Sequence, residues 1–377
     1  MTFNNGSSSH PAPAATAATA GPASANPVGG RLLYLDLLRC LSLLAVTVMH
    51  SSAPLLFSQD TGHLVAGMVY STACLFCVPA LLMISGALML GDSRPMNLSK
   101  FYGKRFVKIL IPLLAWSVIY YLILVLQVGT LPNVNSFLKR FFTGLWSGPL
   151  WFLYMIVGVY LMVPFLRPAF GGRATQRCLV FVGIVFGLQA LNFATRLIWE
   201  LELNHFLTGA IVPYYFGYFV LGHLLNSVDF KMPGGRPALA ALFLACAAIT
   251  TGGEFMAKGD NTMLPNTFFS YQQPLVVSMT AAIFLFFKGW QPSMTRKRAR
   301  IVNELSCLSY GVFLSHILVL MLLSGQIPLI FKHGSGLDCW SVNPWVGPLL
   351  AGLAIFAGAA LLTAGIKRVP GLRKIVP

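Results

Sequence analysis

The sequence predicts an all-α integral membrane protein with about ten transmembrane helices and with its N- and C-termini in the cytoplasm. Composition is the first reason for this prediction. Of the 377 residues, 56% are hydrophobic and only 10% are charged, whereas about 25% of the residues of a soluble domain are charged. The mean hydropathy is +0.73. Water is therefore not the main solvent of this chain.

Ten apolar runs are the second reason, because about 20 mostly apolar residues cross a bilayer. The runs lie near residues 33–57, 64–90, 105–128, 149–166, 178–195, 208–225, 237–252, 268–288, 305–323 and 345–366. The fourth and seventh runs are short, so their ends are defined only to within a few residues. Between the third and fourth runs, residues 135–146 combine Lys and Arg with Phe and Trp. This mixture predicts a helix that lies on the membrane surface.

The two ends of the chain differ from its apolar centre. Residues 1–30 are rich in Ala, Pro, Ser, Gly and Asn and carry no charged side chain, which predicts a disordered cytoplasmic tail. Residues 31–370 then form the predicted membrane domain, and residues 371–377 form a basic C-terminal tail.

The distribution of Lys and Arg is the third reason. If the N-terminus is cytoplasmic, 20 of the 26 Lys and Arg residues fall in cytoplasmic segments, as the positive-inside rule requires. The net charge of +16 is split into short clusters between apolar runs, a pattern typical of membrane proteins and not of nucleic-acid binding. The seven cysteines lie mostly in apolar runs and are predicted to be small buried residues rather than a disulfide framework.

The first apolar run contains three ionisable residues, Asp36, Arg39 and His50. A charged group in a membrane span costs about 3 kcal/mol or more, so each is a candidate functional residue. Asp36 and Arg39 are neighbours on a helix and can pair; an ion pair at the cytoplasmic interface is the structural alternative. His50 lies eleven residues further on, about 16 Å along the helix and about 20° off the face of Arg39. A simple interfacial aromatic residue is the alternative for His50.

Further candidates lie in the other runs, each with a structural alternative. His316 is near mid-membrane in the ninth run, LSYGVFLSHILVL, and is expected to face the bundle or a cavity. The others are Tyr310 one to two turns before it; Ser85 and Gly86, which also suit close helix packing; Lys104, Arg105 and Lys108, which suit a topology anchor or a phosphate site; and Trp151 and Tyr154, which suit an interfacial belt.

Five of these features, in this order, resemble the acyltransferase 3 family of membrane acyltransferases. The stretch from Tyr34 to His50 resembles that family's first helix, whose signature is Arg, ten residues and His. Ser85-Gly86, FYGKRFVKILIP, GPLWFLYMIVGVYLMVP and LSYGVFLSH resemble its later motifs. The resemblance covers residues 31 to about 370. Two departures bear on pocket width: Arg39 is followed by Cys-Leu-Ser where Arg-Gly-x-Ala is common, and Ser-Gly is followed by Ala87 where an aromatic residue is common.

The resemblance implies transfer of an acetyl or other short acyl group from cytoplasmic acyl-CoA to a hydroxyl of a cell-surface or lipid-linked glycan. It implies a short, stand-alone member in a bacterial inner membrane, with acetyl-CoA as a substrate and no permanently bound cofactor. The expected partners are acyl-CoA, the glycan acceptor and membrane lipids, without nucleic acid.

Roles follow for the candidate residues under this resemblance. His50 is the expected general base or transient acyl carrier, and Arg39, with Asp36 beside it, is expected to position the donor. Ser85, Gly86, Lys104, Arg105 and Lys108 are expected at the donor, and Trp151, Tyr154, Tyr310 and His316 at the substrate pocket. Succinyl transfer is an alternative within the class. A transporter or flippase of a glycan or lipid intermediate is the competing class, although the sequence contains no paired repeat with broken helices.

Overall fold

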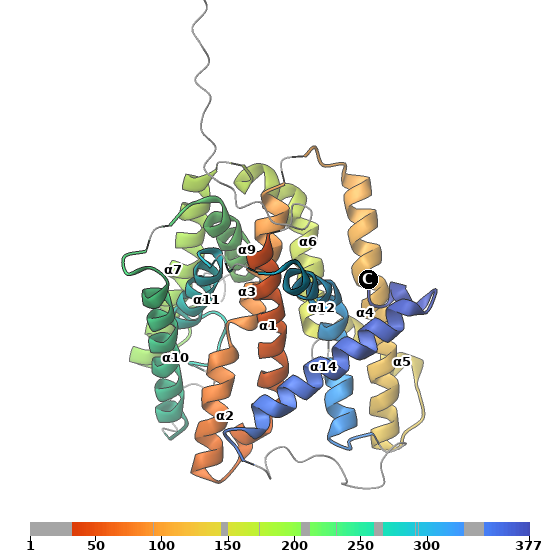
Figure 1. Ribbon diagram of the computed structural model, residues 1–377. Helices are drawn as coiled ribbons and strands as arrows, with labels where there is room; N and C mark the ends of the chain where they lie inside the picture. The colour runs from red at the N-terminus through yellow and green to blue at the C-terminus, as the bar shows by residue number, and fades with distance from the viewer. Residues whose placement is uncertain are drawn as a thin grey trace, which may run out of the picture.

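The computed structural model describes residues 32–92, 94–144, 150–172, 174–204, 212–230, 232–259, 267–290, 292, 294–327 and 343–377. In these ranges the regular structure is entirely helical (Figure 1). The helices are α1 (Leu33–Ser52), η1 (Ala53–Phe57), α2 (Thr61–Cys74), α3 (Cys77–Leu90), α4 (Leu98–Val128), α5 (Val134–Thr143), α6 (Leu150–Phe170), α7 (Thr175–Trp199), α9 (Val212–Ser227), α10 (Gly235–Gly259), α11 (Pro274–Lys288), α12 (Arg296–Leu323), α14 (Gly347–Arg368) and η2 (Leu372–Lys374). The tail predicted for residues 1–30 lies outside the described residues.

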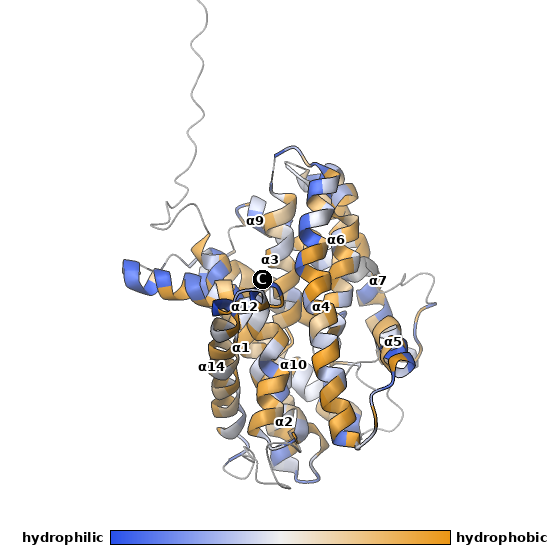
Figure 2. Ribbon diagram, turned by 90° about the vertical axis from the view of Figure 1, so that its right-hand side faces the viewer, coloured by the Kyte–Doolittle hydropathy of each residue, from blue (hydrophilic) through white to orange (hydrophobic). Residues whose placement is uncertain are grey.

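Among the described residues, eight helical segments are long and apolar enough to cross a membrane, so the chain is a multi-pass membrane protein. Figure 2 shows hydrophobic residues along the sides of the helices and hydrophilic residues near the ends of the bundle. The two remaining predicted runs correspond to the shorter helices α9 and α11. The count of ten and the orientation stay predictions. We call the end of the bundle where α1 begins the inner end, which the charge pattern predicts to be cytoplasmic, and the opposite end the outer end.

The run near residues 64–90 was expected to be one helix, and the structure divides it into α2 and α3 at Leu75 and Phe76. Pro79 explains the break. It lacks an N–H and cannot donate to the carbonyl of Leu75 four residues earlier, so the regular hydrogen-bond ladder is interrupted there. At the end of α2, Leu75 N–H donates to the Thr72 carbonyl at 3.1 Å, a bond to the third preceding residue that closes the last turn.

Helix α1 lies at the centre of the bundle, where it contacts α2, α3, α11, α12 and α14 (Figure 1). Its contact with α14 is close because Gly352 leaves no room for a side chain: an added Cβ would be 2.5 Å from Val48 Cγ2. Thr47 Oγ1 donates to the Gly352 carbonyl at 2.9 Å, and Ser51 Oγ donates to the Pro348 carbonyl at 2.7 Å. These polar bonds between helices hold the predicted catalytic helix in one position.

Helices α3 and α9 pack closely through two glycines. A Cβ on Gly86 would be 1.7 Å from the Phe219 carbonyl oxygen, and a Cβ on Gly222 would be 2.0 Å from the Met83 carbonyl oxygen. Small residues allow helix backbones to approach each other in this way in membranes.

The C-terminal tail is tied to α4. Trp116, near the middle of α4, donates its indole Nε1 to the Ile375 carbonyl at 3.1 Å, and Val376 is fully buried. The end of the chain is therefore held against the middle of α4.

Candidate active site

Two parallel helices, α1 and α12, carry the ionisable residues inside the bundle. Both helices begin at the inner end, and they are in contact. Arg39 on α1 meets Ser306 on α12, and further along His50 meets His316. The eleven-residue spacing on α1 is thus matched by a ten-residue spacing on α12, and the two levels lie about 15 Å apart along the helices.

The inner level is a hydrogen-bonded network of Asp36, Arg39 and Ser306. Arg39 Nη1 donates to Ser306 Oγ at 2.8 Å and lies 3.3 Å from Asp36 Oδ1, and Ser306 Oγ donates to Asp36 Oδ1 at 2.5 Å. The side chains of Asp36 and Arg39 are 8% and 20% exposed, and Ser306 is 2% exposed. The i, i+3 pair expected from the spacing exists, but it is largely buried and joined to another helix, unlike a solvated interfacial pair.

Ser306 was not singled out from the sequence. It is one of several serines in α12 and has no distinctive local motif. Its position opposite Asp36 and Arg39 arises from the packing of two helices about 270 residues apart in the chain. Only the packing of α1 against α12 identifies Ser306 as a site residue.

The outer level is the pair of imidazoles of His50 and His316, whose ring centroids are 5.1 Å apart with an interplanar angle of 44°. His316 is fully buried and His50 is half-buried. His316 Nδ1 lies 2.6 Å from the Phe313 carbonyl oxygen. Because a carbonyl only accepts, Nδ1 carries the hydrogen, and in the neutral ring the lone pair is on Nε2. Among the described residues His316 Nε2 has no hydrogen-bond partner, so its lone pair is available to accept a hydrogen bond.

A metal site at this pair would require further ligands. Within the described ranges, no group of three or more His, Cys, Asp or Glu side chains is placed to hold a metal ion. Catalytic zinc typically has three protein ligands.

Aromatic side chains connect the histidine pair to α6. The ring of Phe313 lies 5.7 Å from that of His316 and 4.7 Å from that of Phe152, and Phe152 contacts Trp151 at 6.2 Å. Trp151, a predicted pocket residue, is therefore linked to His316 through two phenylalanines. Tyr154, another predicted pocket residue, donates its hydroxyl to the Phe141 carbonyl of α5 at 2.6 Å, which fixes α5 beside α6.

A family model, described as an acyltransferase domain of the acyltransferase 3 type, matches residues 32–364. The chain belongs to the acyltransferase 3 family. The matched region contains both levels of the site and every candidate residue predicted from the sequence. A search of curated proteins and a search of solved structures each returned no match. The protein is therefore a multi-pass membrane acyltransferase, and its two levels of buried ionisable side chains are the candidate active site of that enzyme.

At the inner end of this acyltransferase, the three basic residues predicted at the donor lie on α4. Lys104, Arg105 and Lys108 are all exposed. The Arg105 guanidinium lies over the ring of Tyr160 at 5.7 Å. The buried hydroxyl of Tyr310 on α12 has no hydrogen-bond partner within the described ranges.

Ser85 and Gly86 lie elsewhere in the acyltransferase. Ser85 Oγ donates to the Leu81 carbonyl of its own helix at 3.0 Å, and Gly86 packs on the backbone of Phe219. These contacts account for both residues by helix packing. Their role in donor binding stays a prediction, and the contacts that the structure gives them do not join them to the basic residues of α4.

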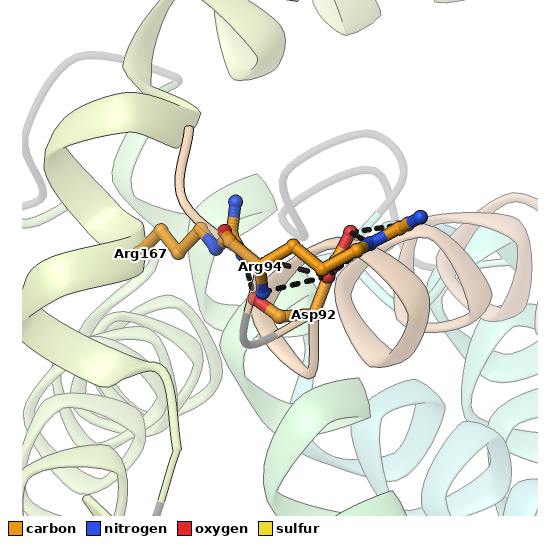
Figure 3. A network of polar contacts seen from close by, with 3 residues as sticks. All are labelled: Asp92, Arg94 and Arg167. Carbon is orange, nitrogen blue, oxygen red and sulfur yellow. Dashed lines mark hydrogen bonds and ion pairs between the residues drawn. The ribbon is translucent and has the colours of Figure 1, made fainter. Parts of the chain in front are cut away.

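The acyltransferase also has a cavity of about 310 Å³ at its inner end, where α3 and α6 finish. Figure 3 shows Arg94 and Arg167 around the Asp92 carboxylate. Hydrogen bonds from Arg94 hold the pKa of Asp92 well below its usual range. Arg167 also donates to the Asp92 and Arg94 carbonyls. Two guanidiniums and one carboxylate give this cavity a net positive charge.

Proposed function

We propose that this acyltransferase moves an acetyl or other short acyl group from cytoplasmic acyl-CoA to a hydroxyl of a cell-surface or lipid-linked glycan, in a bacterial inner membrane. The observation that carries the proposal is the contact of His50 with His316, which lies toward the outer end of α1, while the inner half of α1 holds the Arg39 network. The proposed base, His50, and the cation that can bind an anionic donor, Arg39, are thus separated along α1. This separation is expected if the acyl donor and the glycan acceptor enter from opposite sides of the membrane.

His50 is the proposed general base. It is half-buried, whereas His316 is fully buried, so His50 is the ring that a substrate can reach. A nitrogen of His50 takes the proton of the acceptor hydroxyl while the oxygen attacks the thioester carbonyl. The carbon–sulfur bond then breaks, and the thiolate of CoA takes the proton from the imidazolium. Such proton transfer contributes about 100- to 10,000-fold to a rate.

His316 is the proposed positioning residue for His50. Its Nδ1–H is held by the Phe313 carbonyl, which leaves Nε2 as a hydrogen-bond acceptor. A ring spacing of 5.1 Å allows a His50 N–H to donate to that nitrogen after a small rotation. The opposite nitrogen of His50 would then carry the lone pair that takes the substrate proton. Transient acylation of His50 is the alternative role for the same nitrogen.

The donor is proposed to enter from the inner end. Lys104, Arg105 and Lys108 are exposed there, and the exposed basic residues at the start of α12 add to the positive charge. Such groups suit the phosphates of CoA. Arg39 is about 16 Å from His50 along α1, so the two do not act on the same atom. Arg39 is proposed to position the donor while its thiol arm extends toward His50.

Labelled acetyl-CoA tests the proposal in membranes that contain wild type, His50→Ala, Arg39→Ala or His63→Ala. We expect acylated glycan to be lost in His50→Ala and to require more acetyl-CoA in Arg39→Ala. His63→Ala is the matched control, because His63 is a half-buried histidine that pairs with Asp60 at the outer end. Retained acylation in His50→Ala would overturn the mechanism. Labelled succinyl-CoA in the same assay distinguishes the acyl group, and glycan movement without consumption of any acyl-CoA would support transport instead.

A further inference from the structure

A non-helical segment enters the outer half of the bundle just before α11. Residues Thr267 to Gln273 precede this helix, which has only 15 residues. Gln273 Nε2 donates to Thr250 Oγ1 at 3.2 Å. Thr250 lies nine residues, about 14 Å, before the outer end of α10. Non-helical backbone at such depth is tolerated only where protein buries it or where it lines a polar cavity.

The segment is firmly anchored on α10. The Phe268 backbone N–H donates to Glu254 Oε2 at 3.1 Å. The Phe268 ring fills the space above Gly253, where an added Cβ would be 2.4 Å from Cε1. The side chains of this segment are therefore held in defined positions facing α7.

Helix α7 presents a polar stripe to this segment. Gln189, Asn192 and Arg196 are spaced i, i+3 and i+7 and so share one face. Together with Thr267, Ser270 and Gln273 they line a small cavity of about 30 Å³. A cavity of that size has room for a group no larger than one or two water molecules.

Two buried acceptors in this cavity have no partner within the described ranges: Gln189 Oε1 and Gln273 Oε1. Gln189 is 5% exposed and Gln273 is 2% exposed. The amide of Gln273 has a defined orientation, because its Nε2 donates to the Phe268 carbonyl at 2.7 Å and a carbonyl cannot donate in return. Buried acceptors are nearly always hydrogen-bonded, so these two indicate a ligand that supplies O–H donors.

The charge of the cavity indicates a neutral ligand. Arg196 pairs with Glu202 and donates to Thr267 Oγ1 at 3.3 Å. Its positive charge is therefore balanced within the protein. The other polar side chains of the lining carry amide or hydroxyl groups. These groups form hydrogen bonds with hydroxyl groups and do not attract an anion.

An aromatic wall adjoins the cavity. Tyr271, in the same segment, stacks on Trp151 with ring centroids 6.1 Å apart and an interplanar angle of 24°. Trp151 also contacts Tyr215 at 6.2 Å and is 36% exposed. The C–H face of a sugar ring packs well on such aromatic faces while its hydroxyls reach polar groups at the edge. From Trp151 the aromatic contacts continue through Phe152 and Phe313 to His316.

We propose that this cavity is a sugar-recognition subsite: two hydroxyl groups of the acceptor donate one hydrogen bond each, one to Gln189 Oε1 and one to Gln273 Oε1, while the sugar ring lies against Trp151 and Tyr271. This subsite rests on the proposed function, because the sugar bound here would be the acceptor whose hydroxyl His50 deprotonates. It assigns the acceptor to a neutral sugar and places its recognition on α7 and the segment before α11.

Sugar binding is tested first without catalysis, on full-length protein in lipid nanodiscs. The probes are the methyl glycosides of glucose, galactose, mannose, rhamnose and N-acetylglucosamine, and the readout is the midpoint of thermal unfolding as each concentration rises. The variants are Gln189→Leu and Gln273→Leu, which remove the acceptors and keep the apolar volume. Gln272→Ala, at a half-buried lining position, gives a second test that does not depend on a buried substitution.

Gln127→Leu is the matched control. This glutamine is exposed on α4 and donates to the Gln326 carbonyl at 2.9 Å, away from the cavity. Sugars stabilise all proteins weakly by exclusion from their surface, so the comparison with the control isolates a specific effect. We expect a saturable rise in wild type and in Gln127→Leu that is lost in Gln189→Leu and Gln273→Leu and weakened in Gln272→Ala.

The second measurement uses labelled acetyl-CoA with the glycoside that binds. We expect KM for the glycoside to rise about tenfold or more in Gln189→Leu and Gln273→Leu, with KM for acetyl-CoA unchanged. Equal saturable shifts in wild type and variants, or no saturable shift in wild type, would overturn the subsite. If the shift is specific but no acyl group is transferred, the subsite stands and the proposed function fails. If transfer occurs with an unchanged KM for the glycoside in the variants, the function stands and the subsite fails.

Discussion

Replacement of Ser306 by Ala tests the buried network that links α1 to α12. The change removes a 2.8 Å bond from Arg39 and a 2.5 Å bond to Asp36. A hydrogen bond to a charged group is worth about 1.5–3 kcal/mol in soluble proteins, and bonds between membrane helices average about 0.6 kcal/mol. Asp36 and Arg39 remain 3.3 Å apart, so we expect a loss of about 1–3 kcal/mol for the two bonds together.

Arg39→Ala is expected to cost more than Ser306→Ala. It leaves the carboxylate of Asp36, 8% exposed, without its cationic partner, and breaking a buried pair in this way costs about 3–5 kcal/mol. Denaturant unfolding of purified protein in one detergent measures both variants. The control is Ser315→Ala on the same helix, because Ser315 is buried and donates to the Gly311 carbonyl of its own helix at 2.9 Å.

Activity provides an independent check on the same variant. If the network holds Arg39 for the donor, Ser306→Ala raises KM for acyl-CoA and leaves KM for the acceptor unchanged. A stability loss in Ser306→Ala that equals or exceeds that of Arg39→Ala would refute the reasoning, since it would mean that the hydroxyl and not the charge pair dominates the network. An effect of Ser315→Ala as large as that of Ser306→Ala would refute it as well.

Two further predictions concern other parts of the bundle. Gly86→Ala should strongly destabilise the protein, because its Cβ would be 1.7 Å from the Phe219 carbonyl oxygen, whereas Gly103→Ala, with nothing within 4 Å, should be neutral or stabilising by up to about 1 kcal/mol. The pKa of Asp92 is lower in the folded state than in the unfolded state, so its contribution to stability is present above the ordinary pKa of Asp and is lost as pH falls through the folded value. Asp92→Asn should therefore lower the unfolding midpoint at neutral pH, and the difference from wild type should disappear in strong acid.

Thermal unfolding in detergent measures both effects. Similar unfolding midpoints for Gly86→Ala and Gly103→Ala would show that α3 and α9 do not pack as closely as described. An unfolding difference between wild type and Asp92→Asn that stays constant from neutral pH to well below about pH 4 would show that the pairing of this carboxylate with Arg94 and Arg167 does not contribute to stability.

Much of the membrane architecture could be predicted from the sequence because hydropathy is a local property of the chain. The eight long spans coincide with predicted runs, and the segment expected at residues 135–146 is the helix Val134–Thr143. The break between α2 and α3 was missed, since Pro79 lies inside an otherwise continuous apolar run. Hydropathy does not distinguish a proline near the start of a helix from a proline in a helix interior. Only the hydrogen-bond pattern of the folded chain distinguishes these two positions.

The candidate site was predictable only as far as single helices determine it. The pairing of Asp36 with Arg39 follows from helical spacing, and the family resemblance carried by Arg39 and His50 is borne out by the family match. The contact of His50 with His316 does not follow from either helix, because it depends on how α1 and α12 pack. The same holds for Ser306, which has no sequence signal of its own.

By itself the sequence determined that this protein is a helical membrane acyltransferase with ionisable groups on its first helix. Those features are local: apolar length, the spacing of charges, and short motifs. The tertiary structure decided which groups meet: Ser306 with the Asp36–Arg39 pair, and His316 with His50. It also placed beside an aromatic wall two glutamine oxygens that have no partner in the part of the chain that the structure describes. The physical reason is that helix packing brings together side chains hundreds of residues apart, and no periodicity along one helix specifies the partner that another helix presents to it.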